Sequence, residues 1–231
     1  MRSPDVVLAP GMLCDRRLFE PQIEVLSGNV TVADLTQADS ISGMAEHLLA
    51  GAPARFALAG LSLGGIVALE CVRLAPERIT HLALLDTTPR ADTPEKRDTR
   101  THQMREADAG HFRDIVVNEL KPGYLATSLM NDAALRQLVI DMAVDLGPDV
   151  FHRQSSALMG RRSNEALLPN ITAKTLVLCG EEDRLCPVAL HQQMAATIPN
   201  AHLTVIPDCG HLPTLERPDT VTAALSEWLS Q

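Results

Sequence analysis

Six short runs of apolar residues recur along the chain, and segments with helical spacing separate them. Each run is nearly continuous in apolar residues, which is typical of strands buried on both faces of a parallel sheet. Strands that alternate with helices predict an α/β fold, in which about six parallel strands form a doubly wound sheet with right-handed crossovers. The expected strands are Val6–Ala9, Val30–Leu35, Phe56–Gly60, Leu82–Asp86, Thr175–Cys179 and Leu203–Ile206.

Two of the intervening segments have a clear helical period. In the first, apolar residues from Ile41 to Leu49 recur at the spacing of one helix face, and Ser40 lies where an N-cap is expected. The second runs from Val221 to Leu229 with the same spacing, and Pro218 lies near its first turn. Both patterns predict helices that pack one face against the sheet.

Residues 88–172 interrupt the alternation, because they contain helical patterns but no convincing strand. A segment of this length is too long for a loop inside a compact domain. We therefore expect residues 1–87 and 173–231 to form the core domain and residues 88–172 to form an inserted helical cap. Both ends of the insert are expected at the edge of the sheet where strands end, where ligands bind in open α/β sheets. The alternative is an extra helical layer unrelated to function.

Composition narrows the possible partners. The 20 basic and 29 acidic residues give a net charge of −9, which disfavours nucleic acid and anionic membranes as partners. No apolar run is long enough to span a membrane, and no apolar segment of a signal peptide precedes Asp5. The five cysteines are scattered without a C-x-x-C pair, which argues against structural zinc. We expect reduced thiols and a cytoplasmic location.

The sequence G-L-S-L-G-G at 60–65 lies between an expected strand and an expected helix. A sharp turn at this position projects the central residue, Ser62, above the sheet, and Gly60 and Gly64 let strand and helix pass closely. Ser62 would then lie at a helix N-terminus, where developing negative charge is stabilised. These features make Ser62 the candidate nucleophile; the alternative is a helix N-cap serine in a tight turn.

A serine hydroxyl needs a neighbouring base to become a nucleophile. Of the eight histidines, His211 is the candidate base, because it follows the last expected strand in D-C-G-H-L-P. That position puts an imidazole at the same sheet edge as Ser62. The alternative is a loop histidine at a helix start.

The base in turn needs a carboxylate to orient it. We favour Asp183, which follows the expected strand Thr175–Cys179 in G-E-E-D-R-L-C-P. Glu181 and Glu182 lie nearer the strand end and are competitors. Asp86 ends another strand and is a second candidate, and a solvated turn is the remaining alternative.

The first expected strand ends in A-P-G-M-L-C-D. Gly11 allows a close approach of the backbone, so that the N–H of Met12 can point at the site. The N–H of Leu63, directly after the candidate nucleophile, would be the second donor of an oxyanion hole. A plain strand-to-helix turn is the alternative for the first of these donors.

The chain resembles the α/β-hydrolase superfamily in the order of these residues. A serine in a strand-to-helix turn comes first, an acid after a later strand follows, and a histidine near the C-terminus comes last. Further similar fragments are A-P-E-R-I, L-V-L-C-G-E-E-D and I-P-D-C-G-H-L-P-T-L-E-R-P. The resemblance implies Ser62 as nucleophile, His211 as base, Asp183 as acid, and Met12 and Leu63 as oxyanion donors. The chain departs from the family in having Pro10-Gly11 where His-Gly is usual. The family also commonly begins with two further strands, for which we expect no counterpart here.

We therefore expect a serine hydrolase that cleaves a small carboxylic ester, or a lactone or thioester, through an acyl-enzyme intermediate and without a metal or organic cofactor. A cofactor-free lyase, a C–C hydrolase or a perhydrolase on the same fold is the first alternative. A small-molecule receptor without enzymatic activity is the second. Serine in the turn argues against haloalkane dehalogenase and epoxide hydrolase chemistry, whose enzymes have aspartate there.

The sequence predicts the residues of the substrate pocket less clearly than the catalytic residues. Met104, Met130, Met142 and Met159 could line an adaptable pocket, although each one by itself is more typical of helix packing. An arginine that faces the pocket would favour a carboxylated substrate, whereas a solvated position is more common for any single arginine. The arginines near the oxyanion loop and late in the expected cap are Arg16, Arg17, Arg153, Arg161 and Arg162.

Overall fold

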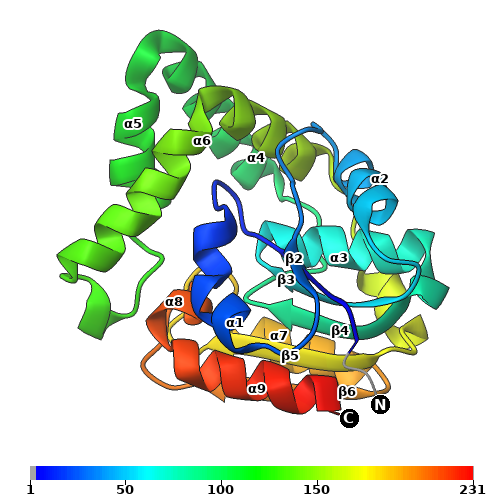
Figure 1. The fold of residues 1–231 in the computed structure, drawn as a ribbon. Helices are drawn as coiled ribbons and strands as arrows, with labels where there is room; N and C mark the ends of the chain where they lie inside the picture. Colours follow the sequence, from blue (N-terminus) through cyan, green and yellow to red (C-terminus); the bar gives the residue numbers. More distant parts are fainter. Residues whose placement is uncertain (1–3, 231) are drawn as a thin grey trace.

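A six-stranded, fully parallel sheet with helices on both faces forms the centre of the computed structural model, which describes residues 4–230 (Figure 1). The strand order is β2-β1-β3-β4-β5-β6. The expected α/β class, the six parallel strands and the doubly wound sheet are confirmed. The strands are β1 (Val6–Ala9), β2 (Val30–Val32), β3 (Phe56–Leu61), β4 (Ile79–Leu85), β5 (Lys174–Gly180) and β6 (Ala201–Ile206).

The central strands are apolar throughout because both of their faces are covered. Side chains alternate across the sheet, so Val7 and Ala9 of β1 join one apolar cluster while Val6 and Leu8 join the other. In β3 every residue is buried. A parallel sheet with helices on both faces explains why these runs show no polar alternation.

Helices α2, α3 and α7 pack on one face of the sheet, and α1 and α9 pack on the other (Figure 1). Two shorter helical turns, Arg16–Phe19 and Pro76–Arg78, precede α1 and β4. The helices of the two faces are α1 (Glu20–Val25), α2 (Ile41–Gly51), α3 (Leu63–Leu74), α7 (Val188–Thr197) and α9 (Pro218–Ser230), with the single turn α8 (Pro213–Glu216) before α9.

Both helices that the sequence predicted are present. The side chain of Ser40 caps α2 by accepting a hydrogen bond from the N–H of Gly43 at 3.1 Å, and the predicted apolar face of α2 is buried. In α9, Val221, Leu225 and Trp228 are buried against the sheet.

The strands differ from the predicted runs at their ends. The strand predicted over Val30–Leu35 ends at Val32, because β2 is an edge strand and only its residues up to Val32 pair with β1. Strand β4 begins at Ile79 rather than Leu82, since its pairing with β3 includes His81, whose polar side chain hides the strand in the sequence. Backbone pairing, rather than apolar composition, sets these boundaries.

Between β4 and β5 the chain is helical, as predicted for residues 88–172. Figure 1 shows α4, α5 and α6 as a group that lies beyond one edge of the sheet. The chain leaves β4 at the carboxyl edge, but because β5 is parallel to β4 it returns at the opposite edge, so the expectation that both ends lie at one edge is wrong. The helical elements are α4 (Pro94–Glu106), Ala107–His111, α5 (Phe112–Ile115), Val116–Leu120, Thr127–Leu129, α6 (Ala133–Gly160) and Glu165–Asn170.

Helix α6 has a break near its middle. Gly147 has φ of +80°, and Pro148 follows it. The positive φ and the missing N–H of proline interrupt the helical hydrogen bonds, so the two halves of α6 differ in direction.

Within residues 4–230, none of the helices has the length and apolar character needed to cross a bilayer. Residues 1–3, which belong to the segment where a signal peptide was not expected, lie outside the described residues.

Candidate active site

Ser62 occupies the sharp turn between β3 and α3. Its φ of +54° lies in the left-handed region, which is uncommon for a residue other than glycine. The Ser62 N–H donates a hydrogen bond to the carbonyl of Leu85 at 2.9 Å, so the neighbouring strand end holds the turn. Backbone strain of this kind persists only where the surrounding structure enforces it, and it directs the hydroxyl away from the sheet.

The glycines on either side of Ser62 allow this turn to form. A methyl group at Gly64 would overlap the carbonyl oxygen of Ala9, and one at Gly60 would overlap the backbone of Gly64. Strand β1, strand β3 and helix α3 therefore meet at a distance that only glycine permits, as the sequence predicted.

His211 lies in the loop after β6, and its imidazole reaches Ser62. Its Nε2 lies 3.0 Å from the Oγ of Ser62, and the side chain is 1% exposed. The His211 N–H donates to the carbonyl of Tyr124 at 2.6 Å, and the rings of these two residues meet edge to face at 5.1 Å between centroids. The residue is therefore held on its backbone and on its ring.

Asp183 completes the chain of contacts. Its Oδ2 lies 2.9 Å from the Nδ1 of His211, and its Oδ1 accepts the N–H groups of Leu185 and Cys186 at 2.8 and 3.1 Å. Burial opposes ionisation, but the charge and hydrogen bond of His211 and the hydrogen bonds from Asp86 and Cys186 outweigh it and keep the pKa of Asp183 below its usual value. Asp183 is thus an ionised, fixed partner for the imidazole.

The competing acids take other positions. Asp86 is fully buried beside Asp183 and hydrogen-bonds to it, while its Oδ1 accepts the N–H of Gly180 at 2.9 Å. Burial and the negative charge of Asp183 raise the pKa of Asp86 well above its usual value, so Asp86 is the neutral member of the pair. Glu181 is exposed, and Glu182 accepts hydrogen bonds from Thr127 instead.

Met12 and Leu63 lie on either side of Ser62, at the end of β1 and the start of α3. Within residues 4–230, neither of their N–H groups donates to a protein acceptor. Both residues line the same cavity as Ser62 and His211. Two free donors beside a hydroxyl are the arrangement that stabilises an oxyanion.

The loop that carries Met12 is fixed by a residue that the sequence analysis missed. Gln154, which is 1% exposed in α6, accepts the N–H of Leu13 at 2.8 Å and donates to the carbonyl of Leu35 at 3.2 Å. Leu13 has φ of +52°, so this contact holds a strained backbone. The available signal was a polar residue at an apolar position of its helix.

Glu216 is a second residue that the sequence analysis did not single out. Its carboxylate accepts the N–H groups of Gly210 and Leu212, on either side of His211, at 3.0 and 2.9 Å, and that of Ala126 at 2.7 Å. Three backbone donors on one carboxylate fix the loop of His211 against the helical segment. A glutamate five positions after a histidine is not a sequence pattern that predicts this role.

Lys121 approaches the oxyanion loop from the other side. Its Nζ lies 3.4 Å from the carbonyl oxygen of Met12 and 4.5 Å from the centre of the Tyr124 ring. The segment between α5 and α6 therefore contacts both His211 and the loop of Met12.

The cavity above Ser62 has a volume of about 500 Å³. Residues of the helical segment form most of its walls, above all α4 and the residues near Tyr124. Of the five arginines suggested by the sequence, Arg161 lines this cavity, together with Arg100 of α4 and Arg184, which were not predicted. The methionine of its walls, among the described residues, is Met12 rather than any of the four that were suggested.

One cluster in the described part of the chain could hold a metal ion. The ligand atoms of Asp183, Cys186 and His211 lie within 4.8 Å of one another. Burial raises the pKa of the Cys186 thiol well above its usual value, and Asp183 and His211 already bond to each other. Within this cluster Asp183 therefore serves to hold the imidazole of His211, and the three groups are poorly suited to binding a cation.

Comparison with known proteins identifies a matching family and several similar enzymes. Residues 7–225 match the alpha/beta hydrolase family. A pimeloyl-[acyl-carrier protein] methyl ester esterase of Nitrosomonas europaea is 26% identical over 94% of this chain and 92% of that protein. A putative non-heme bromoperoxidase of Mycobacterium tuberculosis is 29% identical over 78% of this chain and 69% of that protein. The structure of a thermophilic esterase from Thermogutta terrifontis superposes with a TM-score of 0.88 and 28% identity, covering 99% of this chain and 90% of that chain.

Proposed function

Since the chain belongs to the alpha/beta hydrolase family, we propose that it is a serine hydrolase that cleaves a small carboxylic ester, or the related lactone or thioester. The observation that carries this proposal is the continuous contact of three groups. The Ser62 hydroxyl, the His211 imidazole and the Asp183 carboxylate follow one another at 3.0 and 2.9 Å. Relatives named as esterases favour the same reaction.

In the proposed acylation step, the Ser62 Oγ attacks the ester carbonyl while His211 Nε2 takes the hydroxyl proton. The Met12 and Leu63 N–H groups hold the negative oxygen of the tetrahedral intermediate. His211 then gives its proton to the leaving alcohol, and the carbonyl carbon remains bonded to Ser62. Asp183 holds the imidazole in the required tautomer and stabilises its charged form.

In the proposed deacylation step, His211 takes a proton from water, and the resulting nucleophile attacks the acyl group on Ser62. The acid is released, and the proton returns to the Ser62 oxygen. Ser62, His211, Met12 and Leu63, which take part in these steps, line one cavity, and Asp183 contacts the imidazole of His211 from outside the cavity wall.

We also propose that residues 88–172 act as a cap over a core of residues 1–87 and 173–231. The cavity supports this division, because the core lines it with the loops that follow the strands and with the start of α3, and the helical segment supplies most of its other walls. Such a cap would select the substrate, while the core performs the chemistry.

The test is hydrolysis of a chain-length series of p-nitrophenyl esters, together with labelling by a fluorophosphonate. We expect turnover and labelling of the native protein, and a loss of kcat of about 10⁴-fold or more in Ser62→Ala, because the nucleophile is missing. Turnover that survives in Ser62→Ala would contradict the proposal, as would a native protein that is neither labelled nor active.

A perhydrolase is the second candidate, favoured by the bromoperoxidase named among the relatives. In that reaction hydrogen peroxide, instead of water, attacks the acyl group on Ser62 and releases a peracid. Adding peroxide to the ester assay separates the two functions: a peracid product supports the perhydrolase, and unchanged acid release supports the esterase.

A further inference from the structure

The cavity above Ser62 has an unusual charge for a protein of this composition. Four cationic side chains and three carboxylates line it, whereas the whole chain carries a net charge of −9. The cavity therefore has a local excess of positive charge in a negatively charged protein.

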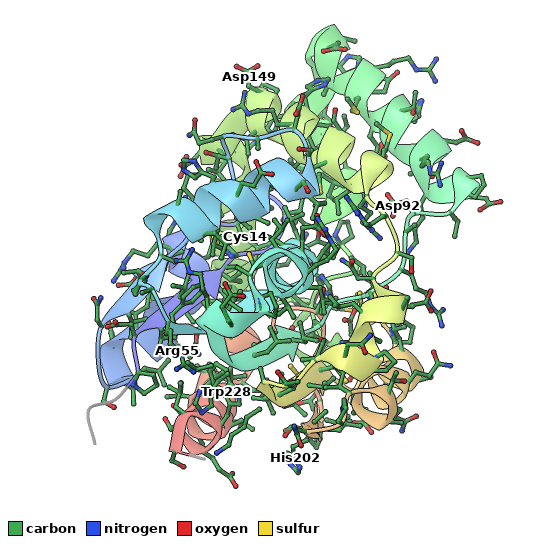
Figure 2. The ribbon with its side chains drawn as sticks, turned by 90° about the vertical axis from the view of Figure 1, so that its right-hand side faces the viewer. Cys14, Arg55, Asp92, Asp149, His202 and Trp228 are labelled. Atoms are coloured by element: carbon green, nitrogen blue, oxygen red, sulfur yellow. The ribbon has the colours of Figure 1, made fainter. Side chains whose placement is uncertain are left out.

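The excess of positive charge lies at two arginines that pair with a single buried carboxylate. Asp92, whose side chain is fully buried, pairs with two arginines at once: Arg100 Nε lies 2.8 Å from its Oδ2, and Arg161 Nη2 lies 2.9 Å from its Oδ1. The side chain of Arg161 is 4% exposed and that of Arg100 is 19% exposed. Figure 2 labels Asp92, which lies two residues before α4, on the side of the molecule formed by the helical segment.

Two guanidinium groups thus share one negative charge. Burying an unpaired charge is costly, so a buried site with one cation too many favours an added anion. The pKa of Arg161 reports this imbalance, because burial and the charge of Arg100 lower it against the opposing effect of Asp92.

Both arginines retain donors for a ligand. Arg161 donates its Nε–H to the carbonyl of Arg90 at 2.8 Å, while its Nη2 forms an ion pair with Asp92 Oδ1 without a hydrogen bond to it, and its Nη1 has no partner among residues 4–230. Arg100 uses Nε on Asp92, and its Nη1 lies 3.6 Å from the Sδ of Met12. Arg100 therefore connects the arginine pair to the residue proposed as an oxyanion donor.

The other charged residues of the cavity do not cancel this excess. Glu119 accepts a hydrogen bond from Gln103 at 3.1 Å, and Glu95 lies exposed in the first turn of α4. Lys96 and Arg184 line the same cavity and balance these two carboxylates. One positive charge remains at the arginine pair.

We propose that Arg100 and Arg161 bind a carboxylate of the substrate, so that the ester cleaved at Ser62 carries a second, negatively charged group. The inference rests on the proposed function and specifies its substrate class. Arginine suits this role because its planar donors match the two oxygens of a carboxylate.

The first test compares matched substrates of the native protein. Monomethyl succinate, glutarate and adipate carry a carboxylate on the acyl side, and their monoamide methyl esters are neutral analogues of the same shape. Acetoxyacetate and acetoxyacetamide form the corresponding pair with the charge on the alcohol side. We expect kcat/KM to favour the charged member of at least one pair by about tenfold or more.

The second test removes one arginine at a time. In Arg100→Gln and Arg161→Gln, we expect the ratio of kcat/KM for the charged and neutral esters to fall about tenfold or more. Arg162→Gln is the matched control, because Arg162 is 61% exposed and lies outside the cavity walls, so its ratio should match that of the native protein. Arg100→Lys and Arg161→Lys keep the charge at Asp92 if the glutamine variants fail to fold.

The outcomes separate the two proposals. Efficient turnover of the neutral esters, with no preference for the charged ones in the native protein, would overturn the anion site and leave the proposed function intact. Turnover of no ester would contradict the proposed function. In that case, calorimetric titration of Ser62→Ala with adipate tests the arginine pair directly: binding that weakens in the double variants with Arg100→Gln or Arg161→Gln supports the site, and no binding overturns it.

Discussion

Glu216 shows at the scale of one residue how the structure holds its base. Its carboxylate accepts hydrogen bonds from three backbone N–H groups, two of which belong to the residues on either side of His211. The imidazole is thus fixed from its own backbone as well as through Asp183.

Replacing the carboxylate of Glu216 should make the position of the His211 imidazole less well fixed. In Glu216→Gln an amide N–H₂ group would face backbone donors, so we expect kcat to fall about tenfold to hundredfold and the free energy of unfolding to fall by about 1–3 kcal/mol. Ester hydrolysis and urea denaturation measure the two effects. Glu227→Gln, in an exposed position of α9, is the control, and equal losses in both variants would contradict the assigned role.

Asp86 predicts a pH dependence of stability. Burial and the charge of Asp183 raise its pKa in the folded protein, so the native state keeps a proton that the unfolded chain releases above about pH 4. The stabilising effect of this proton is therefore complete below that pH and is lost as the pH rises toward the native pKa.

Asp86→Asn should remove this loss, because the amide stays neutral and can still donate to Asp183. We expect the variant to gain stability relative to the native protein by at most about 1.4 kcal/mol per pH unit above about pH 4, with the smallest difference below it. Urea denaturation over a pH series measures the gain. Exposed Asp149 provides the control Asp149→Asn, and a difference that grows toward acid pH would refute the sign.

At the scale of elements, helix α6 does more than cover the cavity. Through Gln154 it holds the loop after β1, and through Arg161 at its end it reaches Asp92 before α4. One helix of the segment between β4 and β5 thus sets the positions of both the proposed oxyanion donor and the proposed anion site.

Removing the side chain of Gln154 should disconnect α6 from the oxyanion loop. We expect Gln154→Ala to lower kcat about tenfold or more and to destabilise the fold by about 1–3 kcal/mol, because the N–H of Leu13 loses its partner while buried. The rate of fluorophosphonate labelling should fall in parallel. Gln137→Ala, exposed in the same helix, is the comparison, and unchanged labelling in Gln154→Ala would exclude this role.

Element order and type were largely predictable, whereas element ends were not. Apolar runs identified all six strands because a parallel sheet covered on both faces excludes polar side chains from its centre. The runs missed the polar start of β4 and extended β2 too far, since pairing at a sheet edge depends on the neighbouring strand.

At the scale of the whole molecule, the five cysteines are free and buried. Burial raises the pKa of Cys71 and Cys179 to about 12, so these thiols are protonated at neutral pH. The cytoplasmic location that cysteine usage suggested stays a prediction, and the state of the thiols is one of its consequences.

Titration with Ellman's reagent should find almost no reactive thiol in the native protein, because thiolates are scarce and inaccessible. After denaturation without reductant we expect all five to react. Two thiols fewer than expected would reveal a disulfide, and rapid reaction of the native protein would contradict the burial of these side chains.

The sequence by itself determined the fold class and the turn at Ser62, and it favoured Asp183 and His211 as neighbours of Ser62, because the loops that follow parallel strands lie at one edge of the sheet. Only the tertiary structure decided that Asp86 supports Asp183, that Gln154 and Glu216 brace the two loops, and that Arg100 and Arg161 share Asp92. The contacts of Asp86, Gln154 and Arg161 join residues that are distant along the chain, and no local sequence pattern indicates which partner a buried polar side chain will have.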